Sequence, residues 1–402
     1  MNAADMLADI AGDHAELTAI RRDIHAHPEM GLKEVRTAAL VAAKLREWGV
    51  EVTEGVGVTG VVGVIRGTRP VGPSNRERAI GLRADMDALA IPEQTGVEYA
   101  SQNAGVMHAC GHDGHTTMLL GAAKYLSRNR DFAGTVNLIF QPAEEGRGGA
   151  VKMLEDGLFE RFPCDAIYGM HNMPGYQIGK FAIRTGPMLA GTGVWKVTFH
   201  GTGGHGGAYP HKATDVSIAA AQFIMALQTV VSRNVSPLDT AVLSVGSIHG
   251  GSNLSPNVMP AEMEITGTMR AFDKAVMAII DQRLPALANA MAMAVGCTVD
   301  VTMRWGTTPL VNAAEQTEQC VAAATALVGP ASVNPNATAS TGGEDFAFMM
   351  EQRPGAMILI GNGVNSDGSA HQVHTPHYNF NDEIIPHGVA FWAQIVQNEL
   401  AQ

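Results

Sequence analysis

The sequence predicts an α/β protein made of a discontinuous domain, residues 1–186 and 307–402, interrupted by an α+β domain at residues 187–306. Its 402 residues correspond to two or three domains of roughly 150 residues each. In both outer segments, helical and strand patterns alternate, which is typical of a mostly parallel sheet covered by helices. The inserted segment instead follows the order strand, helix, strand, strand, helix, strand.

The first outer segment opens with two helical patterns. The first of them ends before Pro28, because proline disfavours helix at the residue that precedes it. Residues 68–78 are rich in Pro, Gly, Ser, Asn and Arg, which predicts a loop between two strands. The predicted helices are residues 13–24, 33–48, 116–127 and 150–156, and the predicted strands are residues 61–65, 79–83, 135–140 and 165–170.

The inserted segment combines long amphipathic helices with strands that have one exposed face. The predicted helices are residues 215–233 and 275–295, and the predicted strands are residues 194–199, 240–248, 261–270 and 297–305. This order predicts a four-stranded antiparallel sheet with two helices on one face, a ferredoxin-like arrangement. After residue 307 the first pattern resumes, with a helix at 314–328, a strand at 356–360 and a final helix after residue 382.

Composition excludes several classes of protein. The 39 acidic residues outnumber the 27 lysines and arginines, and the net charge of -12 repels nucleic acid and anionic membranes alike. The sequence has no run of about 18 apolar residues, and its first residues carry acids where a secretory signal would be basic. The four cysteines have no close spacing typical of a disulfide framework. We therefore expect a cytoplasmic protein without nucleic-acid or membrane partners.

Polar side chains follow three of the apolar strands directly, and another group precedes a helix. The side chains concerned are Asp85, Asp87, Glu144, Glu145 and His171 after strands, and Cys110 and His112 before the helix. In open α/β sheets, ligands bind at the carboxyl ends of the strands, so we expect these side chains to converge on one edge.

A thiolate, several imidazoles and adjacent carboxylates form the ligand set of a divalent transition-metal site. A structural zinc site is closed by four ligands and has no use for a further carboxylate, so Glu144 beside Glu145 favours a catalytic site. A metal-stabilised binding protein without catalytic activity is the alternative from a different class.

Six motifs stand in order between residues 21 and 382. They are LRADMDAL at 82–89, HACGHDGH at 108–115, QPAEEG at 141–146, GMHN at 169–172, GGEDF at 342–346 and HTPHY at 374–378. This string resembles the M20 metallopeptidase clan. Within the clan it is similar to the amidohydrolase branch, which holds hippurate hydrolases, N-acyl-amino-acid amidohydrolases and plant auxin-conjugate hydrolases.

The resemblance implies a catalytic domain that binds one or two divalent metal ions, zinc or manganese, through five ligands. These ligands are Cys110, His112, Glu145, His171 and His374, with Cys110 as the bridging ligand. Glu144 would be the general base. Asp85 and Asp87 would either orient the ligands from behind or serve a purely structural role.

The resemblance also assigns roles to the inserted domain, as a lid and as the surface of a homodimer or homotetramer. Residues 199–211 resemble the lid loop of the family, in which His205 would polarise the scissile carbonyl of its own or a partner's active site. Asn257 and Arg270 are candidates for binding the substrate carboxylate, and Arg270 is equally consistent with a surface salt bridge at a strand end.

The implied reaction is hydrolysis of the amide bond of an N-acyl amino acid, hippurate-like or N-acetylated, to a carboxylate and a free amino acid. The alternative within the same clan is a dipeptidase or an aminopeptidase, which would need a polar or acidic group to receive a free α-amine.

Overall fold

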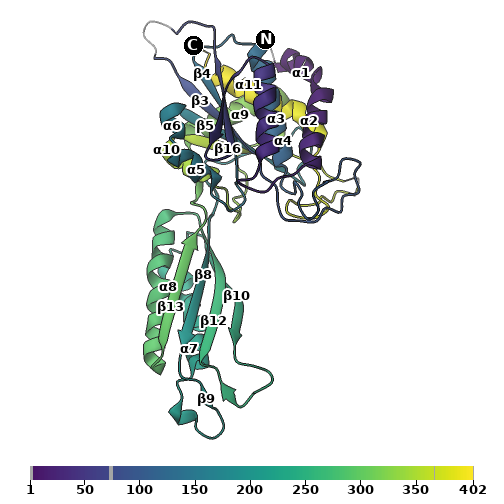
Figure 1. Ribbon diagram of the computed structural model, residues 1–402. Helices are drawn as coiled ribbons and strands as arrows, with labels where there is room; N and C mark the ends of the chain where they lie inside the picture. Colours follow the sequence, from purple (N-terminus) through teal and green to yellow (C-terminus); the bar gives the residue numbers. More distant parts are fainter. Residues whose placement is uncertain (1–2, 72–75, 366, 402) are drawn as a thin grey trace. The chain divides into compact units, whose positions relative to one another are not determined.

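The structure is a computed structural model that describes residues 3–71, 76–365 and 367–401. Residues 1–2 and 72–75, which belong to the predicted acidic start and to the predicted loop 68–78, lie outside the described residues. The chain forms two compact units (Figure 1). The first unit comprises Met1–Gly186, Val311–Thr338 and Asp345–Gln402, and the second comprises Pro187–Leu310 and Ala339–Glu344.

The first unit is built on a mixed sheet that has eight strands within the described residues. In spatial order they are β1 (Glu51–Val56), β2 (Gly60–Arg66), β4 (Thr135–Gln141), β3 (Ala79–Asp85), β5 (Ala166–Met173), β16 (Gly355–Gly361), β6 (Phe181–Ala182) and β15 (Val333–Asn334). The central strands β4, β3, β5 and β16 are parallel. The mostly parallel sheet expected from the sequence is therefore confined to the centre. The β1–β2 and β2–β4 pairs are antiparallel, because a short turn joins β1 to β2 as a hairpin.

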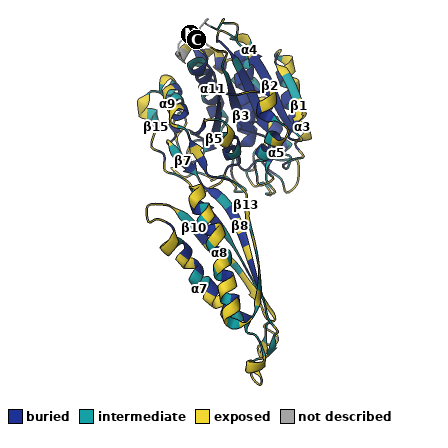
Figure 2. Ribbon diagram, turned by 90° about the vertical axis from the view of Figure 1, so that its left-hand side faces the viewer, coloured by how far each residue is buried: buried dark blue, intermediate teal, exposed yellow. Residues whose placement is uncertain are grey.

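Helices cover both faces of this sheet, and its central strands are buried between them (Figures 1 and 2). One face carries α5 (Gly149–Glu155), α6 (Leu158–Arg161) and α10 (Phe346–Gln352). The other side carries α1 (Ala3–Ala11), α2 (His14–Ala26), α3 (Val35–Glu47), α4 (His112–Arg128), α9 (Ala314–Val328) and α11 (Ile385–Glu399). Short 3₁₀ turns at Pro330–Ser332 and Asp382–Ile384 precede β15 and α11.

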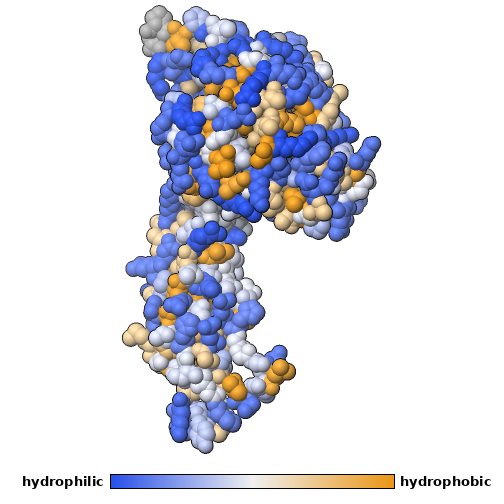
Figure 3. Space-filling model, in the orientation of Figure 1, coloured by the Kyte–Doolittle hydropathy of each residue, from blue (hydrophilic) through white to orange (hydrophobic). Residues whose placement is uncertain are grey.

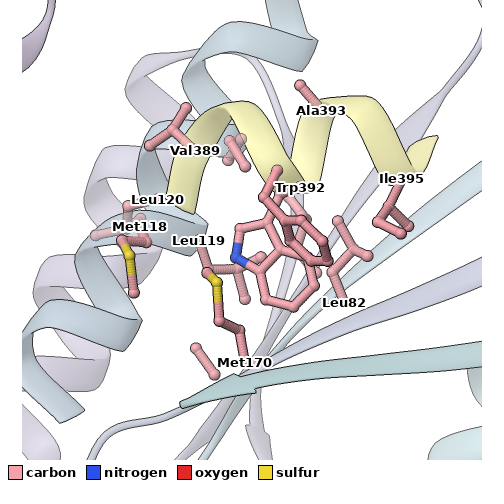
Figure 4. Packing of buried hydrophobic residues seen from close by; sticks show 14 of the residues in the cluster. Leu82, Met118, Leu119, Leu120, Met170, Val389, Trp392, Ala393 and Ile395 are labelled. Atoms are coloured by element: carbon pink, nitrogen blue, oxygen red, sulfur yellow. The ribbon is translucent and has the colours of Figure 1, made fainter. Parts of the chain in front are cut away.

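The main core of the first unit lies between the sheet and helices α4 and α11 (Figure 4). Trp392 of α11 is buried there, against Leu82 of β3 and Met170 of β5. The two helices approach closely, since a Cβ on Gly388 would meet the Met118 sulfur at 2.0 Å. The packing of this layer fixes α4 against the strands whose ends carry the polar clusters.

The second unit has an antiparallel sheet with the strand order β10 (Ala241–Gly250), β12 (Glu262–Ala271), β8 (Gly191–His200) and β13 (Thr298–Trp305). Helices α7 (Val216–Asn234) and α8 (Lys274–Val295) pack against it and against each other. A two-stranded ladder pairs β9 (Gly204–His205) with β11 (Val258–Met259), and β7 (Gly186–Leu189) and β14 (Leu310–Asn312) stand at the boundaries. A 3₁₀ turn spans Pro210–Lys212.

Helix α7 is long and apolar enough to cross a membrane by length and composition alone. Its apolar side, however, enters the core of the second unit through Val216, Phe223, Leu227 and Val230. Helix α7 is therefore buried in the way expected of a core helix in a folded domain.

The second unit also includes residues 307–310 and 339–344, which the sequence assigns to the outer domain. The reason is main-chain pairing. The Ala190 N–H is shared between the carbonyls of Ser340 and Gly342, and the Ser340 N–H donates to Met188. Residues 339–344 therefore follow the strands of the second unit.

The surface is mostly hydrophilic on the face shown in Figure 3, with apolar side chains in scattered patches. Several large exposed side chains belong to the second unit. They are Met225 on α7, Ile248 on β10, Met293 on α8, and Leu238 and Leu254 in loops.

We expect Trp392→Ala to lower the free energy of unfolding by about 3–5 kcal/mol, because it removes a large side chain from a core that cannot close around the gap. Urea denaturation followed by far-ultraviolet circular dichroism measures the change. Leu238→Ala, at a side chain that is 94% exposed, is the control and should shift stability by about 0.5 kcal/mol or less. A loss below about 1 kcal/mol for Trp392→Ala would contradict the central place of this side chain.

Candidate metal centre

The strand ends of the first unit carry the predicted site residues. β4 ends at Gln141, immediately before the segment 142–149 that carries Glu144 and Glu145. His171 lies inside β5 rather than after it as the sequence suggests, because β5 keeps pairing with β16 up to Met173. Parallel neighbours bring these ends to one edge of the sheet.

The turn that carries Cys110 and His112 depends on the glycine between them. Gly111 has φ 95°, a left-handed conformation, and a Cβ there would lie 2.3 Å from Asn172 Nδ2. Helix α4 begins at His112, four residues before the predicted start, so the imidazole projects from the first helical turn. Glycine at this position is required by both backbone angle and space.

One group of potential ligand atoms comes from the turn and from β5. The ligand atoms of Cys110, His112 and His171 all lie within 4.8 Å of one another. The Cys110 sulfur is 3.3 Å from His171 Nε2. The structure therefore brings together three of the five predicted ligands in one group.

A second group shares the same sulfur. The ligand atoms of Cys110, Glu145 and His374 also lie within 4.8 Å of one another, and His374 Nε2 is 3.1 Å from Glu145 Oε1. His374 has φ 63°, an uncommon backbone conformation for a residue with a side chain. Cys110 therefore belongs to both groups of potential ligand atoms.

Neighbouring polar groups orient the two buried imidazoles toward the cluster. His171 Nδ1 donates to the Asn172 carbonyl at 2.7 Å, which leaves the Nε2 lone pair facing Cys110. His112 Nδ1 donates to Asp87 Oδ1 at 3.3 Å, and its buried Nε2 has no hydrogen-bond partner among the described residues. A second hydrogen bond that fixes the imidazole tautomer is typical of metal-binding histidines. This set of thiol, imidazole and carboxylate ligand atoms fits a divalent transition metal.

Burial and neighbouring groups shift the pKa values of the side chains in the cluster in different directions. Burial lowers the pKa of His171 to about 3, so this imidazole is neutral, which is the form that binds metals. Hydrogen bonds to Cys110 and Glu145 raise the pKa of His374 to about 10. Burial, and to a lesser extent the Glu145 charge, raise the pKa of the Cys110 thiol, and a cation bound beside it would lower that pKa.

Behind the ligands, Asp85 takes part in a chain of buried hydrogen bonds. Its Oδ1 accepts from His115 Nδ1 at 2.7 Å, and His115 Nε2 accepts from the Asn172 main-chain N–H at 3.0 Å. Asn172 Nδ2 donates to the Cys110 carbonyl, and the Tyr378 hydroxyl donates to Asn172 Oδ1, each at 2.7 Å. Asp85 thus reaches the backbone of two ligand-bearing segments. Reasoning from the sequence gave no role to His115 or Tyr378, although both stand inside quoted motifs.

Carboxylates hold the main chain of the segment that carries the two glutamates. Asp87 accepts the N–H groups of Glu144 and Glu145, each at 3.0 Å. Glu34, fully buried, accepts the Ala143 N–H at 2.8 Å, and burial raises the pKa of Glu34. No local sequence pattern indicates Glu34, which precedes a helix as an ordinary surface acid would.

The remaining predicted site residues belong to the second unit. His205 is exposed on β9, and the Gly206 N–H donates to the Asn257 carbonyl at 2.8 Å, so His205 and Asn257 are close neighbours. Arg270 lies near the C-terminal end of β12. Its guanidinium donates to the carbonyls of Gly193, Met269 and Thr341. Within this unit, Asn257 and Arg270 are not brought together.

Comparisons with known proteins point to one family. The sequence profile of "Peptidase family M20/M25/M40" matches residues 81–398. A hippurate hydrolase of Campylobacter jejuni is 39% identical over 395 residues, which are 98% of each chain. An N-acetyl-L-cysteine deacetylase of Bacillus subtilis is 40% identical over 375 residues, 92% of this chain and 85% of that protein. Among solved structures, a dinuclear metal-binding peptidase of the M20 family from Bacillus subtilis is 30% identical, covers 97% of this chain and 99% of that chain, and has a TM-score of 0.82.

These similarities extend over nearly the whole chain, and the named relatives are hydrolases of amides. They set aside the binding protein without catalytic activity, and they confirm the resemblance carried by the six motifs. The chain belongs to the peptidase family M20/M25/M40 and is a metal-dependent enzyme that acts on amide bonds.

Proposed function

We propose that the enzyme hydrolyses the amide bond of N-acyl amino acids, hippurate-like or N-acetylated, and releases a carboxylate and a free amino acid. The observation that carries the proposal is the position of Cys110 in two ligand groups beside the Glu144 and Glu145 pair. The hippurate hydrolase and the N-acetyl-L-cysteine deacetylase among its relatives support this class of substrate.

The metal ligands in this proposal are those expected from the sequence. They are Cys110, His112, Glu145, His171 and His374, which would hold one or two divalent ions. A divalent metal in such a site polarises a carbonyl and lowers the pKa of water. Thiolate and imidazole favour zinc, whereas the carboxylate is also suited to manganese.

Glu144 is the general base in this mechanism. Its carboxylate lies in one group with the ligand atoms of His112 and Glu145, within 4.8 Å. Asp87 accepts a hydrogen bond from the Glu144 main-chain N–H, so the backbone from which the Glu144 side chain projects is held in place. Glu144 accepts a proton from the attacking water and delivers it to the leaving nitrogen, which lets the amine depart neutral.

The second unit, residues 187–306 in the predicted division, is proposed as the lid and the dimerisation domain. The His205 Nδ1 accepts the Ala208 N–H at 3.2 Å, so the neutral ring carries its proton on Nε2, where it can donate to a developing oxyanion. Asn257, beside His205, and Arg270 are proposed as alternative candidates for binding the substrate carboxylate, because this unit does not bring the two side chains together. The exposed Met225 and Ile248 support a homo-oligomer, dimer or tetramer, formed through this unit.

We also propose a cytoplasmic location without nucleic-acid or membrane partners. None of the four cysteines forms a disulfide within the described residues, which suits a reducing compartment. The net charge of -12 disfavours polyanionic partners.

The proposal is tested by a panel of N-acetyl, N-benzoyl and indole-acyl amino acids, together with unblocked dipeptides, assayed before and after chelation. Chelation should abolish activity, and a divalent transition metal should restore it, whereas a sample passed through the same exchange without chelator should remain active. Turnover confined to unblocked dipeptides would favour the dipeptidase. Full activity in protein shown to be metal-free by elemental analysis would exclude the mechanism.

Glu144→Gln and Glu145→Gln form a matched pair at adjacent positions. Glu144→Gln should lower kcat by about 10²- to 10⁴-fold and retain metal, because it removes only the proton acceptor. Glu145→Gln should lose metal as well, because an amide is a poorer ligand than a carboxylate. Steady-state kinetics and metal analysis of the same samples separate the two roles. Retention of metal in both variants, with only Glu145→Gln inactive, would reverse the assignment.

His205→Ala should lower kcat by about 10²- to 10³-fold with metal content unchanged, as expected for the loss of an oxyanion donor. Mixing His205→Ala protein with Glu144→Gln protein tests whether the site is shared between subunits. Recovery of activity after subunit exchange would show sharing, and an inactive mixture with proven exchange would show that His205 serves its own chain. Full activity of His205→Ala alone would remove His205 from the mechanism.

A further inference from the structure

Asp345 lies outside the predicted ligand set, although it stands inside the motif at residues 342–346. It precedes α10 and is 1% exposed, so its carboxylate is buried in the first unit. A buried carboxylate is stable only when hydrogen bonds or a counter-charge compensate it. The partners of this carboxylate therefore indicate what the residue does.

The Asp345 carboxylate joins the two ends of the segment that carries the proposed base. Its Oδ1 accepts from Gln141 Nε2 at 2.6 Å, and its Oδ2 accepts from the Ala150 N–H at 3.0 Å. Gln141 directly precedes the segment 142–149, and Ala150 directly follows it. The segment is closed further by Gly149, where a Cβ would lie 1.6 Å from the Pro142 carbonyl oxygen.

The main chain of Asp345 contacts the base itself. The Asp345 N–H donates to Glu144 Oε1 at 3.4 Å, a long hydrogen bond of the kind that tightens when a substrate is bound. One residue thus holds the Glu144 carboxylate through its backbone and the Glu144-bearing segment through its side chain.

The Arg83 guanidinium supplies hydrogen bonds and a positive counter-charge to this group of side chains. It is 1% exposed, donates from Nε to Gln141 Oε1 at 2.8 Å and from Nη1 to Asp85 Oδ2 at 2.7 Å, and stands 3.5 Å from Asp345 Oδ1. The guanidinium compensates both carboxylates. Gln141 is therefore fixed at both ends, with its oxygen toward Arg83 and its nitrogen toward Asp345.

We propose that Asp345 is a positioning residue that sets the orientation of the Glu144 carboxylate for proton transfer. This inference rests on the base role of Glu144 in the proposed function. A general base must lie about 2.6–3.2 Å from the proton it removes, so a loosely held carboxylate spends less time in reach. Asp345 acts on kcat through Glu144 and not on metal binding or substrate affinity.

Asp345→Asn tests the proposal at constant size. Its amide turns one acceptor into a donor, which then faces either the Ala150 N–H or Gln141 Nε2. We expect kcat to fall by about 10- to 100-fold, the range seen when an outer hydrogen-bond partner is lost, with KM and metal content unchanged. Gln141→Glu places a second carboxylate next to Asp345 and should cause a similar loss of kcat. This variant replaces Asp345→Asn in the test if Asp345→Asn does not fold.

The exchanged pair Gln141→Glu with Asp345→Asn provides a rescue. Residue 141 then accepts from both Arg83 and residue 345, the side-chain oxygen of residue 345 takes the place of Asp345 Oδ2 as acceptor of the Ala150 N–H, and the total charge is unchanged. The double variant should recover most of the kcat lost by either single variant. Failure to recover, in a folded and metal-loaded protein, would overturn the proposed hydrogen-bond pattern.

Combination with Glu144→Gln distinguishes a positioning role from a structural one. If Asp345 acts through Glu144, Asp345→Asn or, in its place, Gln141→Glu should cause no further loss of kcat in the Glu144→Gln background. An equal loss in both backgrounds would overturn the proposal. If Glu144→Gln alone kept wild-type activity, Glu144 would not be the base. The proposed function, and not the role of Asp345, would then be at fault.

Glu399→Gln is the matched control. Glu399 is also a buried carboxylate, 5% exposed, and it accepts from the Tyr168 hydroxyl and from Arg78 Nη2, each at 2.6 Å. Arg78 stands just before β3, at the end of the strand opposite Asp85. Glu399→Gln should leave kcat unchanged, and a loss equal to that of Asp345→Asn would mean that burial of charge alone explains the effect.

Discussion

Buried carboxylates that accept main-chain N–H groups hold the segment between β4 and α5, and the rest of the centre depends on this arrangement. The pairs are Glu34 with Ala143, Asp87 with Glu144 and Glu145, and Asp345 with Ala150. A buried N–H group must find an acceptor, and a buried carboxylate must find donors, so each satisfies the other at little net cost. Hydrogen bonds to charged groups are worth about 1.5–3 kcal/mol each, which is enough to keep a short segment in one conformation.

That single conformation allows two adjacent glutamates to serve different purposes. Ala143 has φ 53°, an uncommon backbone state for alanine, and the Glu34 carboxylate on its N–H helps to maintain it. From this fixed backbone, Glu145 reaches His374 while Glu144 reaches the Asp345 N–H. If the segment were mobile, both carboxylates would compete for the same cation, and neither would be reserved for proton transfer.

The sequence predicted the α/β class and the convergence of polar residues, because both follow from local patterns. Apolar strands followed directly by polar residues show which strand ends meet, and the ligand atoms of Cys110, His112 and His171 do lie together. In the first unit, strand order and direction were not predictable, since β2 of the β1–β2 hairpin pairs antiparallel with β4, a strand distant in the sequence. The roles of Glu34 and His115 were missed for a related reason. Their importance comes from burial against distant segments, which no local pattern reports.

The first turn of α4 is fixed from behind by a second buried ionic cluster. Asp113, next to His112, accepts from His25 Nδ1 at 2.8 Å and lies 3.4 Å from Arg21 Nη1. Although burial alone would lower it, Asp113 and Glu93 raise the pKa of His25 to about 9, so the ring is charged at neutral pH. The cluster thus contains its own cations. The carboxylates of the metal centre also face cations, since His374, with its pKa raised to about 10, lies 3.1 Å from Glu145, and Arg83 donates to Asp85. A metal ion bound by His374 must displace the proton of that imidazole, so metal binding at this centre is coupled to proton release.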